Sequence, residues 1–173
     1  LRRREQALLE AYERAWVAVL PAVRGLRWGD FARGFVEWVQ ASTAKAFADG
    51  IEAACLAAPI RSLRFSRLGE RSLPRLAAHP GLARFTGRID LSGIPTGNSG
   101  AAALLASPHF RASALDFDSC ELRDDVALAL AGSPQAASLR ALSLADNRLG
   151  ADAARALGES PYLDALRTLL LHD

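Results

Sequence analysis

The chain has 173 residues, of which half are hydrophobic, and its formal net charge is +2. This length and apolar content are enough for a sizeable core, whereas no apolar run approaches the roughly eighteen residues that cross a bilayer. We therefore expect a folded protein with no membrane span. The two cysteines, Cys55 and Cys120, lack metal-ligand spacing, which favours reduced thiols and a cytoplasmic location.

The charges are distributed unevenly along the chain. Residues 1–87 carry 14 basic and 8 acidic groups, whereas residues 88–173 carry 7 and 11. The basic half invites a nucleic-acid interpretation. However, the run Arg2 to Arg4 is followed by Glu5, and no platform of aromatic and basic residues accompanies it. We expect the partner not to be a nucleic acid.

The first predicted element is an amphipathic helix over residues 1–20. Its polar side carries Arg2, Arg3, Arg4, Glu5, Glu10, Glu13 and Arg14, and its apolar side carries Leu8, Leu9, Tyr12, Trp16 and Leu20. A strand is predicted over Gly34–Val39, and its Val36 stands 27 residues before Leu63. A helix from Ser42 or Thr43 to Ala57 follows and ends before Pro59. Together these elements predict an N-terminal cap over residues 1–59.

Five short apolar pairs, each with one residue between its members, recur at intervals of 26, 26, 27 and 27 residues. They are Leu63-Arg64-Phe65, Ile89-Asp90-Leu91, Leu115-Asp116-Phe117, Leu142-Ser143-Leu144 and Leu169-Leu170-Leu171. Such a period is typical of repeat proteins, in which units of strand, turn and helix stack to bury their apolar faces. The pattern predicts a solenoid over residues 60–173, with four units and the first strand of a fifth.

Alanine- and leucine-rich segments between these pairs predict the helices, which cover Arg71–Ala78, Ser99–Ala106, Asp124–Ala131 and Ala151–Gly158. A serine-proline pair follows each of the last three and is expected to stop the helix. In the first unit Pro80 comes two residues early, which predicts a shortened helix.

The unit with the clearest pattern reads Leu139-x-x-Leu142-x-Leu144-x-x-Asn147-x-Leu149-Gly150. It resembles the leucine-rich repeat of the ribonuclease-inhibitor-like class. The resemblance implies an α/β solenoid with a parallel sheet on its concave side, helices on its convex side, and a turn ladder of backbone hydrogen bonds at Asn147 and Cys120. Ile94 and Leu68 occupy the ladder position in the earlier units, so those turns need other partners.

A second resemblance covers Trp28 to Glu37, which is similar to the segment that precedes the repeats in bacterial proteins with a repeat-companion domain. The biochemical role of that family is not established. The resemblance therefore implies a bacterial source and no catalytic residues.

The residues between the apolar members of each pair should point outward from the sheet. Asp90, Asp116 and Asp118 are expected to lie close together, because adjacent strands are about 4.8 Å apart. Three carboxylates suit a cation or an acid/base pair, but we favour a solvated acidic stripe for a basic partner, flanked by Arg64 and Arg88.

Other enzyme signatures are weak. The stretch Gly93 to Gly100 follows a strand and precedes a helix, as phosphate-binding loops do, but it lacks the lysine and aligns with a repeat turn. No serine has the surroundings of a nucleophile elbow. We therefore expect no enzyme, no cofactor and no metal.

The sequence favours a protein-interaction module. Its concave face would bind a partner protein through Arg64, Arg88, Asp90, Asp116, Asp118 and Ser143. Two alternatives stay open, which are a regulator of a small GTPase or another enzyme, and a structural solenoid that self-associates through its open C-terminal end.

Overall fold

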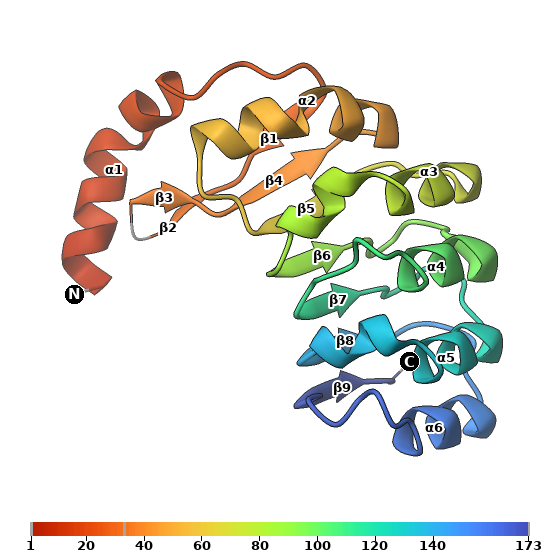
Figure 1. Cartoon of the computed structure of the whole chain (residues 1–173). Coiled ribbons are helices and arrows are strands. Elements are labelled where there is room, and N and C mark those ends of the chain that lie inside the picture. The colour runs from red at the N-terminus through yellow and green to blue at the C-terminus, as the bar shows by residue number, and fades with distance from the viewer. Residues whose placement is uncertain (1, 33, 173) are drawn as a thin grey trace.

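The computed structural model describes residues 2–32 and 34–172, without the side chains of Arg2, Glu5, Gln6, Leu9, Glu10, Glu13, Arg14, Ala32 and Glu70. The fold is mixed α/β (Figure 1). In the described part, seven strands form one sheet in the order β1-β4-β5-β6-β7-β8-β9. β1 pairs antiparallel with β4, and every later pair is parallel.

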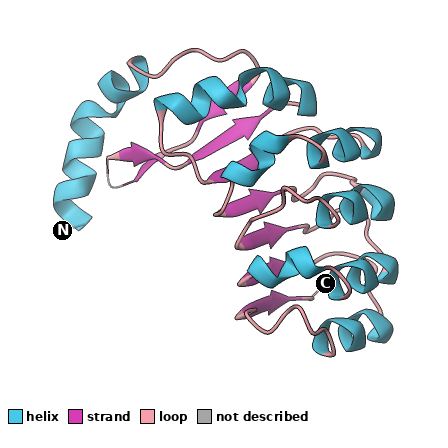
Figure 2. Ribbon diagram, viewed as in Figure 1, coloured by secondary structure: helices cyan, strands magenta, loops and turns pink. Residues whose placement is uncertain are grey.

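The strands of this sheet are β1 (Leu26–Trp28), β4 (Trp38–Ala41), β5 (Ser62–Phe65), β6 (Arg88–Asp90), β7 (Ala114–Asp116), β8 (Ala141–Ser143) and β9 (Thr168–Leu170). Five helices cover one face of it, and consecutive helices contact each other (Figure 2). They are α2 (Ala44–Ala57), α3 (Leu73–Ala77), α4 (Gly97–Leu105), α5 (Asp124–Ala131) and α6 (Ala151–Gly158). We call the opposite face, which no helix of the described part covers, the open face.

The core lies between the sheet and these helices. Leu63, Ile89, Leu115 and Leu142 stand opposite one another in adjacent strands, and each is at most 1% exposed. Leu169 continues the same register in β9 but is 39% exposed. β9 is the last strand in the sheet order, so its far side has no neighbour among the described strands.

Local sequence accounts for several helix ends. Thr43 caps α2, because its hydroxyl oxygen accepts a hydrogen bond from the Ala46 N–H at 3.1 Å. α5 and α6 have the predicted bounds. α3 is short, as predicted, but begins at Leu73 and not Arg71 and ends at Ala77 and not Ala78. α4 covers Gly97–Leu105 and not the predicted Ser99–Ala106. Two 3₁₀ helices, Pro80–Arg84 and Pro134–Ser138, were not predicted, and each begins at a proline that the sequence analysis treated as a simple stop.

The predicted strand Gly34–Val39 is wrong in extent and register. Its first part forms a small hairpin, in which β3 (Phe35–Val36) pairs antiparallel with β2 (Phe31–Ala32). Gly34 adopts φ +84° at the turn, a conformation that favours glycine. The parallel partner of β5 is β4, where Val39 and not Val36 stands opposite Leu63.

The N-terminal helix, α1 (Arg2–Ala18), lies within the predicted range of residues 1–20 and ends two residues earlier. The predicted apolar side does not cover the core, because Leu8 is 44% and Tyr12 is 52% exposed. Trp16 instead packs against the hairpin, where the centroid of its ring lies 5.6 Å from the centroid of the Phe31 ring. Leu1 lies outside the described residues, as do the side chains of Arg2, Glu5, Leu9, Glu10, Glu13 and Arg14, which were also predicted for this helix. β1, which the sequence analysis missed, provides the strand beyond β4.

Candidate functional site

Alternation along the strands places one set of side chains on the open face. In β5, Leu63 and Phe65 are buried in the core, whereas Arg64 is exposed on the other side. By the same alternation the open face carries Arg27, Trp38, Gln40, Ser62, Arg64, Arg88, Asp90, Ala114, Asp116, Ala141, Ser143, Thr168 and Leu170.

Four of the predicted binding residues form a single row across the sheet. Arg64 stands opposite Asp90, Asp90 opposite Asp116, and Asp116 opposite Ser143. Arg88 lies two residues before Asp90 on β6, and Asp118 follows the end of β7. The six residues named from the sequence therefore belong to one surface.

The acids of this row are paired with basic side chains from the preceding strand. Arg64 Nε lies 3.2 Å from Asp90 Oδ2, and Arg88 Nη1 donates a hydrogen bond to Asp116 Oδ2. Both arginine side chains remain about half exposed, whereas the Asp116 side chain is 13% exposed. The arginines thus present more surface to solvent than the acids do.

The third acid is held by its neighbours in β8 and the following turn. Asp118 Oδ1 accepts hydrogen bonds from the Ser143 hydroxyl and from the Ala145 N–H, the latter at 3.0 Å. Asp116 and Ser143 are both buried. The expectation of a solvated acidic stripe is therefore wrong, because neighbouring side chains already occupy these carboxylates.

Burial also affects the acid at the centre of the row. Desolvation raises the pKa of Asp116 above its ordinary value, although the hydrogen bond and charge of Arg88 oppose that shift. The charges of Asp90 and Asp118 raise it further. The carboxylates therefore act on one another electrostatically, and Arg88 offsets part of their mutual repulsion.

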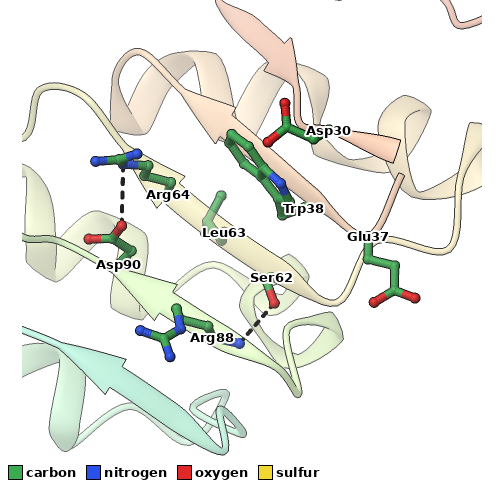
Figure 3. Close-up of a pocket in the computed structure, with 8 residues that line it drawn as sticks. All are labelled: Asp30, Glu37, Trp38, Ser62, Leu63, Arg64, Arg88 and Asp90. Carbon is green, nitrogen blue, oxygen red and sulfur yellow. Dashed lines mark hydrogen bonds and ion pairs between the residues drawn. The ribbon is translucent and has the colours of Figure 1, made fainter. Parts of the chain in front are cut away.

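A hollow of about 480 Å³ opens on the same face beside these pairs (Figure 3). Its lining residues are Asp30, Glu37, Trp38, Ser62, Leu63, Arg64, Arg88 and Asp90. Asp30 and Trp38 were not predicted from the sequence to belong to this surface. The signal that finds Trp38 is the strand phase, because a strand with Val39 inward must place Trp38 outward.

The predicted ladder residues meet at the turns after β7 and β8. Asn147 Oδ1 accepts the N–H groups of Cys120 at 3.1 Å and Leu122 at 3.0 Å, and its amide nitrogen donates to the Phe117 carbonyl at 2.7 Å. The Cys120 thiol lies 3.1 Å from the Leu91 carbonyl oxygen, to which it donates. These side chains therefore bond the backbone of successive turns.

The described residues contain no group of three or more His, Cys, Asp or Glu placed to hold a metal ion. In the Gly93 to Gly100 stretch, Gly93 and Gly97 adopt positive φ angles and α4 begins at Gly97. No described helix has the length and apolar character required to span a membrane.

No family model matches this sequence, and no curated protein matches it either.

Proposed function

We propose that this chain is a leucine-rich-repeat solenoid of the ribonuclease-inhibitor-like class that binds a partner protein through its open face. The aligned core residues Leu63, Ile89, Leu115 and Leu142 support the repeat assignment, because each occupies the same place in its strand. The contacts of Asn147 with the turn before it support the family resemblance. The open face is then the concave side of the solenoid.

The observation that carries the binding proposal is the composition of the open face around the hollow. Trp38, Arg64 and Arg88 stand together there, and tryptophan and arginine are the residue types most enriched among those that dominate binding energy at protein interfaces. The hollow gives such a partner a place for a projecting side chain. A folded sheet presents this surface without the cost of ordering the backbone on binding.

The test compares two double variants with the same change in charge. Arg64→Ala with Arg88→Ala alters the open face, and Arg71→Ala with Arg75→Ala alters two exposed arginines on the helix side. A partner is first isolated from lysate of the source organism with the wild-type chain, then purified and titrated by calorimetry against all three proteins. Circular dichroism confirms that each variant is folded.

We expect the open-face variant to bind the purified partner about tenfold more weakly, and the helix-side variant to bind as the wild type does. Equal affinities for all three proteins, or a loss confined to the helix-side variant, would overturn the proposal. A GTP-hydrolysis assay with a purified GTPase partner distinguishes simple binding from regulation.

The free thiols of Cys55 and Cys120 support the cytoplasmic location that this proposal includes.

Self-association is a second candidate, favoured by the exposure of Leu169 and Leu170 at the edge strand β9, which are 39% and 42% exposed. An unpaired strand with exposed leucines can pair with another copy. Sedimentation equilibrium measures the mass directly. A dimer that Leu170→Lys converts to a monomer would support this role, and a wild-type monomer at high concentration would exclude it.

A further inference from the structure

The hollow on the open face contains an acid that the neighbouring arginines do not neutralise. Arg64 pairs with Asp90, and Arg88 pairs with Asp116. Asp30 is exposed, lines the hollow, and takes part in no hydrogen bond or ion pair recorded for the described residues. Figure 3 shows Asp30 next to the Trp38 side chain.

The Trp38 indole is positioned by the absence of a side chain at Gly29. A Cβ atom at Gly29 would lie 2.1 Å from the Cε2 atom of the indole, so the ring lies directly against the glycine backbone. The Gly29 N–H also donates to the Trp38 carbonyl oxygen at 3.0 Å. The ring is therefore held at the wall of the hollow by close contact with the end of β1.

The electrostatic balance favours a cationic occupant. The Arg64 and Arg88 charges are already matched by Asp90 and Asp116, so the Asp30 carboxylate adds a negative charge to the lining that these two pairs do not offset. An anion in the hollow would meet the repulsion of Asp30, and the pairing of Arg88 with Asp116 on the next strand leaves Arg88 less able to attract it. A cation would be attracted to Asp30 and to the electron-rich face of an indole.

We propose that the hollow binds one arginine or lysine side chain of the protein partner, with its charged end between the Trp38 ring and the Asp30 carboxylate. This inference rests on the proposed function, since it names the anchor by which the partner docks. A volume of about 480 Å³ lies within the range of ligand pockets and accommodates a long side chain with its flanking backbone.

The test uses short peptides as probes and the indole N–H signal of Trp38 as the reporter. Acetyl-glycyl-arginyl-glycinamide is titrated into ¹⁵N-labelled protein and followed by heteronuclear NMR. The matched probes replace arginine by citrulline, which has nearly the same shape without the charge, or by glutamate. The indole signals of Trp16 and Trp28 serve as internal controls, because neither residue lines the hollow.

We expect the arginine peptide to shift the Trp38 signal in a saturable manner that weakens as salt is added, whereas the citrulline and glutamate peptides leave it unchanged. Asp30→Asn should weaken arginine binding about threefold, the loss expected for one exposed ion pair. Asp164→Asn removes an exposed carboxylate far along the chain and should leave binding unchanged. In a Trp38→Leu variant, the backbone amide of Arg64 replaces the indole as the reporter and should no longer shift.

A Trp38 signal that responds to the glutamate peptide, responds equally to citrulline, or is unaffected by all three probes would overturn the inference. If the purified partner still binds through the open face in that case, the proposed function stands and the cationic anchor alone is wrong. If the arginine peptide binds but no partner distinguishes the open-face variant, the hollow is a cation-binding site and the interaction proposal fails separately.

Discussion

The hydroxyl of Ser133 donates a hydrogen bond at 2.7 Å to the carbonyl oxygen of Leu105, the last residue of α4. Ser160 makes the same contact at 2.7 Å with Ala131 at the end of α5, and Ser107 with Ala77 at the end of α3. The last carbonyls of a helix have no partner within it, so each serine satisfies one at the end of the preceding helix. These hydrogen bonds link consecutive helices.

Replacing one of these serines should weaken the stack. Ser133→Ala leaves the Leu105 carbonyl without its partner, and we expect the free energy of unfolding to fall by about 1 kcal/mol. Urea denaturation followed by circular dichroism measures the change. Ser66→Ala is the control, since Ser66 is exposed and should alter stability by less than about 0.5 kcal/mol. Equal stability of the two variants would show that the interhelix bond contributes nothing.

The positions of the strands after residue 60 were predicted closely because one physical requirement recurs there. Each strand must place its apolar pair inward, so the interval between pairs locates β5 to β9. The serine-proline pairs were correctly placed, but their second role was missed. Sequence spacing marks where a helix ends and does not indicate which carbonyl of the preceding helix a hydroxyl will reach.

The N-terminal part was less predictable because its strands do not follow the period. Glycine at position 34 permits a hairpin that shifts the pairing strand, so Val39 replaces Val36 opposite Leu63. That shift decides which side Trp38 faces, and a strand phase set by Val36 therefore did not predict Trp38 on the open face. The Arg88–Asp116 contact was missed for another reason, since register predicts proximity without predicting which charges pair.

Asn147 should be among the least replaceable polar residues in the described chain. Its side chain bonds the backbone of Phe117, Cys120 and Leu122, together with carbonyls of its own turn at Leu144 and Ala145. Asn147→Leu leaves several buried backbone groups unpaired, and we expect a loss of roughly 2–4 kcal/mol in the free energy of unfolding. Thermal and urea denaturation measure it.

The comparison for Asn147 is Asn98, which lies in the first turn of α4 and is less buried. Its side-chain oxygen accepts the Arg123 N–H, and its amide nitrogen donates to the Asp125 carboxylate. Asn98→Leu removes fewer backbone contacts and should destabilise the protein by about 1 kcal/mol. If the two variants lose the same stability, the network around Asn147 has no special importance.

Arg88→Ala should destabilise the protein in a pH-dependent way. Burial already raises the pKa of Asp116, so its ionised form is disfavoured in the folded state, and Arg88 partly offsets this. A carboxyl pKa raised by folding favours the folded protein at low pH, and that contribution is lost as pH rises through the folded value. Removing Arg88 should raise the pKa further and lower stability by about 1 kcal/mol at neutral pH.

The difference between Arg88→Ala and the wild type should shrink near pH 3, where Asp116 is mostly protonated in both proteins. Arg64→Ala is the matched variant, and its effect should be smaller because the Asp90 side chain is 20% exposed and therefore better solvated. Urea denaturation of the wild type and both variants, at neutral pH and near pH 3, gives the difference in the free energy of unfolding for each variant at each pH. A difference for Arg88→Ala that does not change with pH would mean that packing, not charge, explains the effect.

The two thiols should react at very different rates in the folded protein. Burial raises the pKa of Cys120 from 9.0 to about 11, so almost none of it is thiolate near pH 8, and the side chain has no exposed surface. Burial also raises the pKa of Cys55, but the positive charge of Arg84 opposes that rise. Cys55 lies at a surface hollow, where a reagent can reach it.

Alkylation with iodoacetamide, followed by mass spectrometry of the digested protein, measures both rates. We expect Cys55 to be modified in the native protein and Cys120 only after unfolding, with equal rates in denaturant. Alkylation of Cys120 requires opening of the turn after β7, in which the Cys120 thiol bonds the Leu91 carbonyl and the Cys120 N–H bonds Asn147. Asn147→Leu loosens this turn and should therefore accelerate the alkylation of Cys120. Modification of Cys120 at the native rate of Cys55 would show that this turn opens readily, and the buried hydrogen bonds there would then have to be weak.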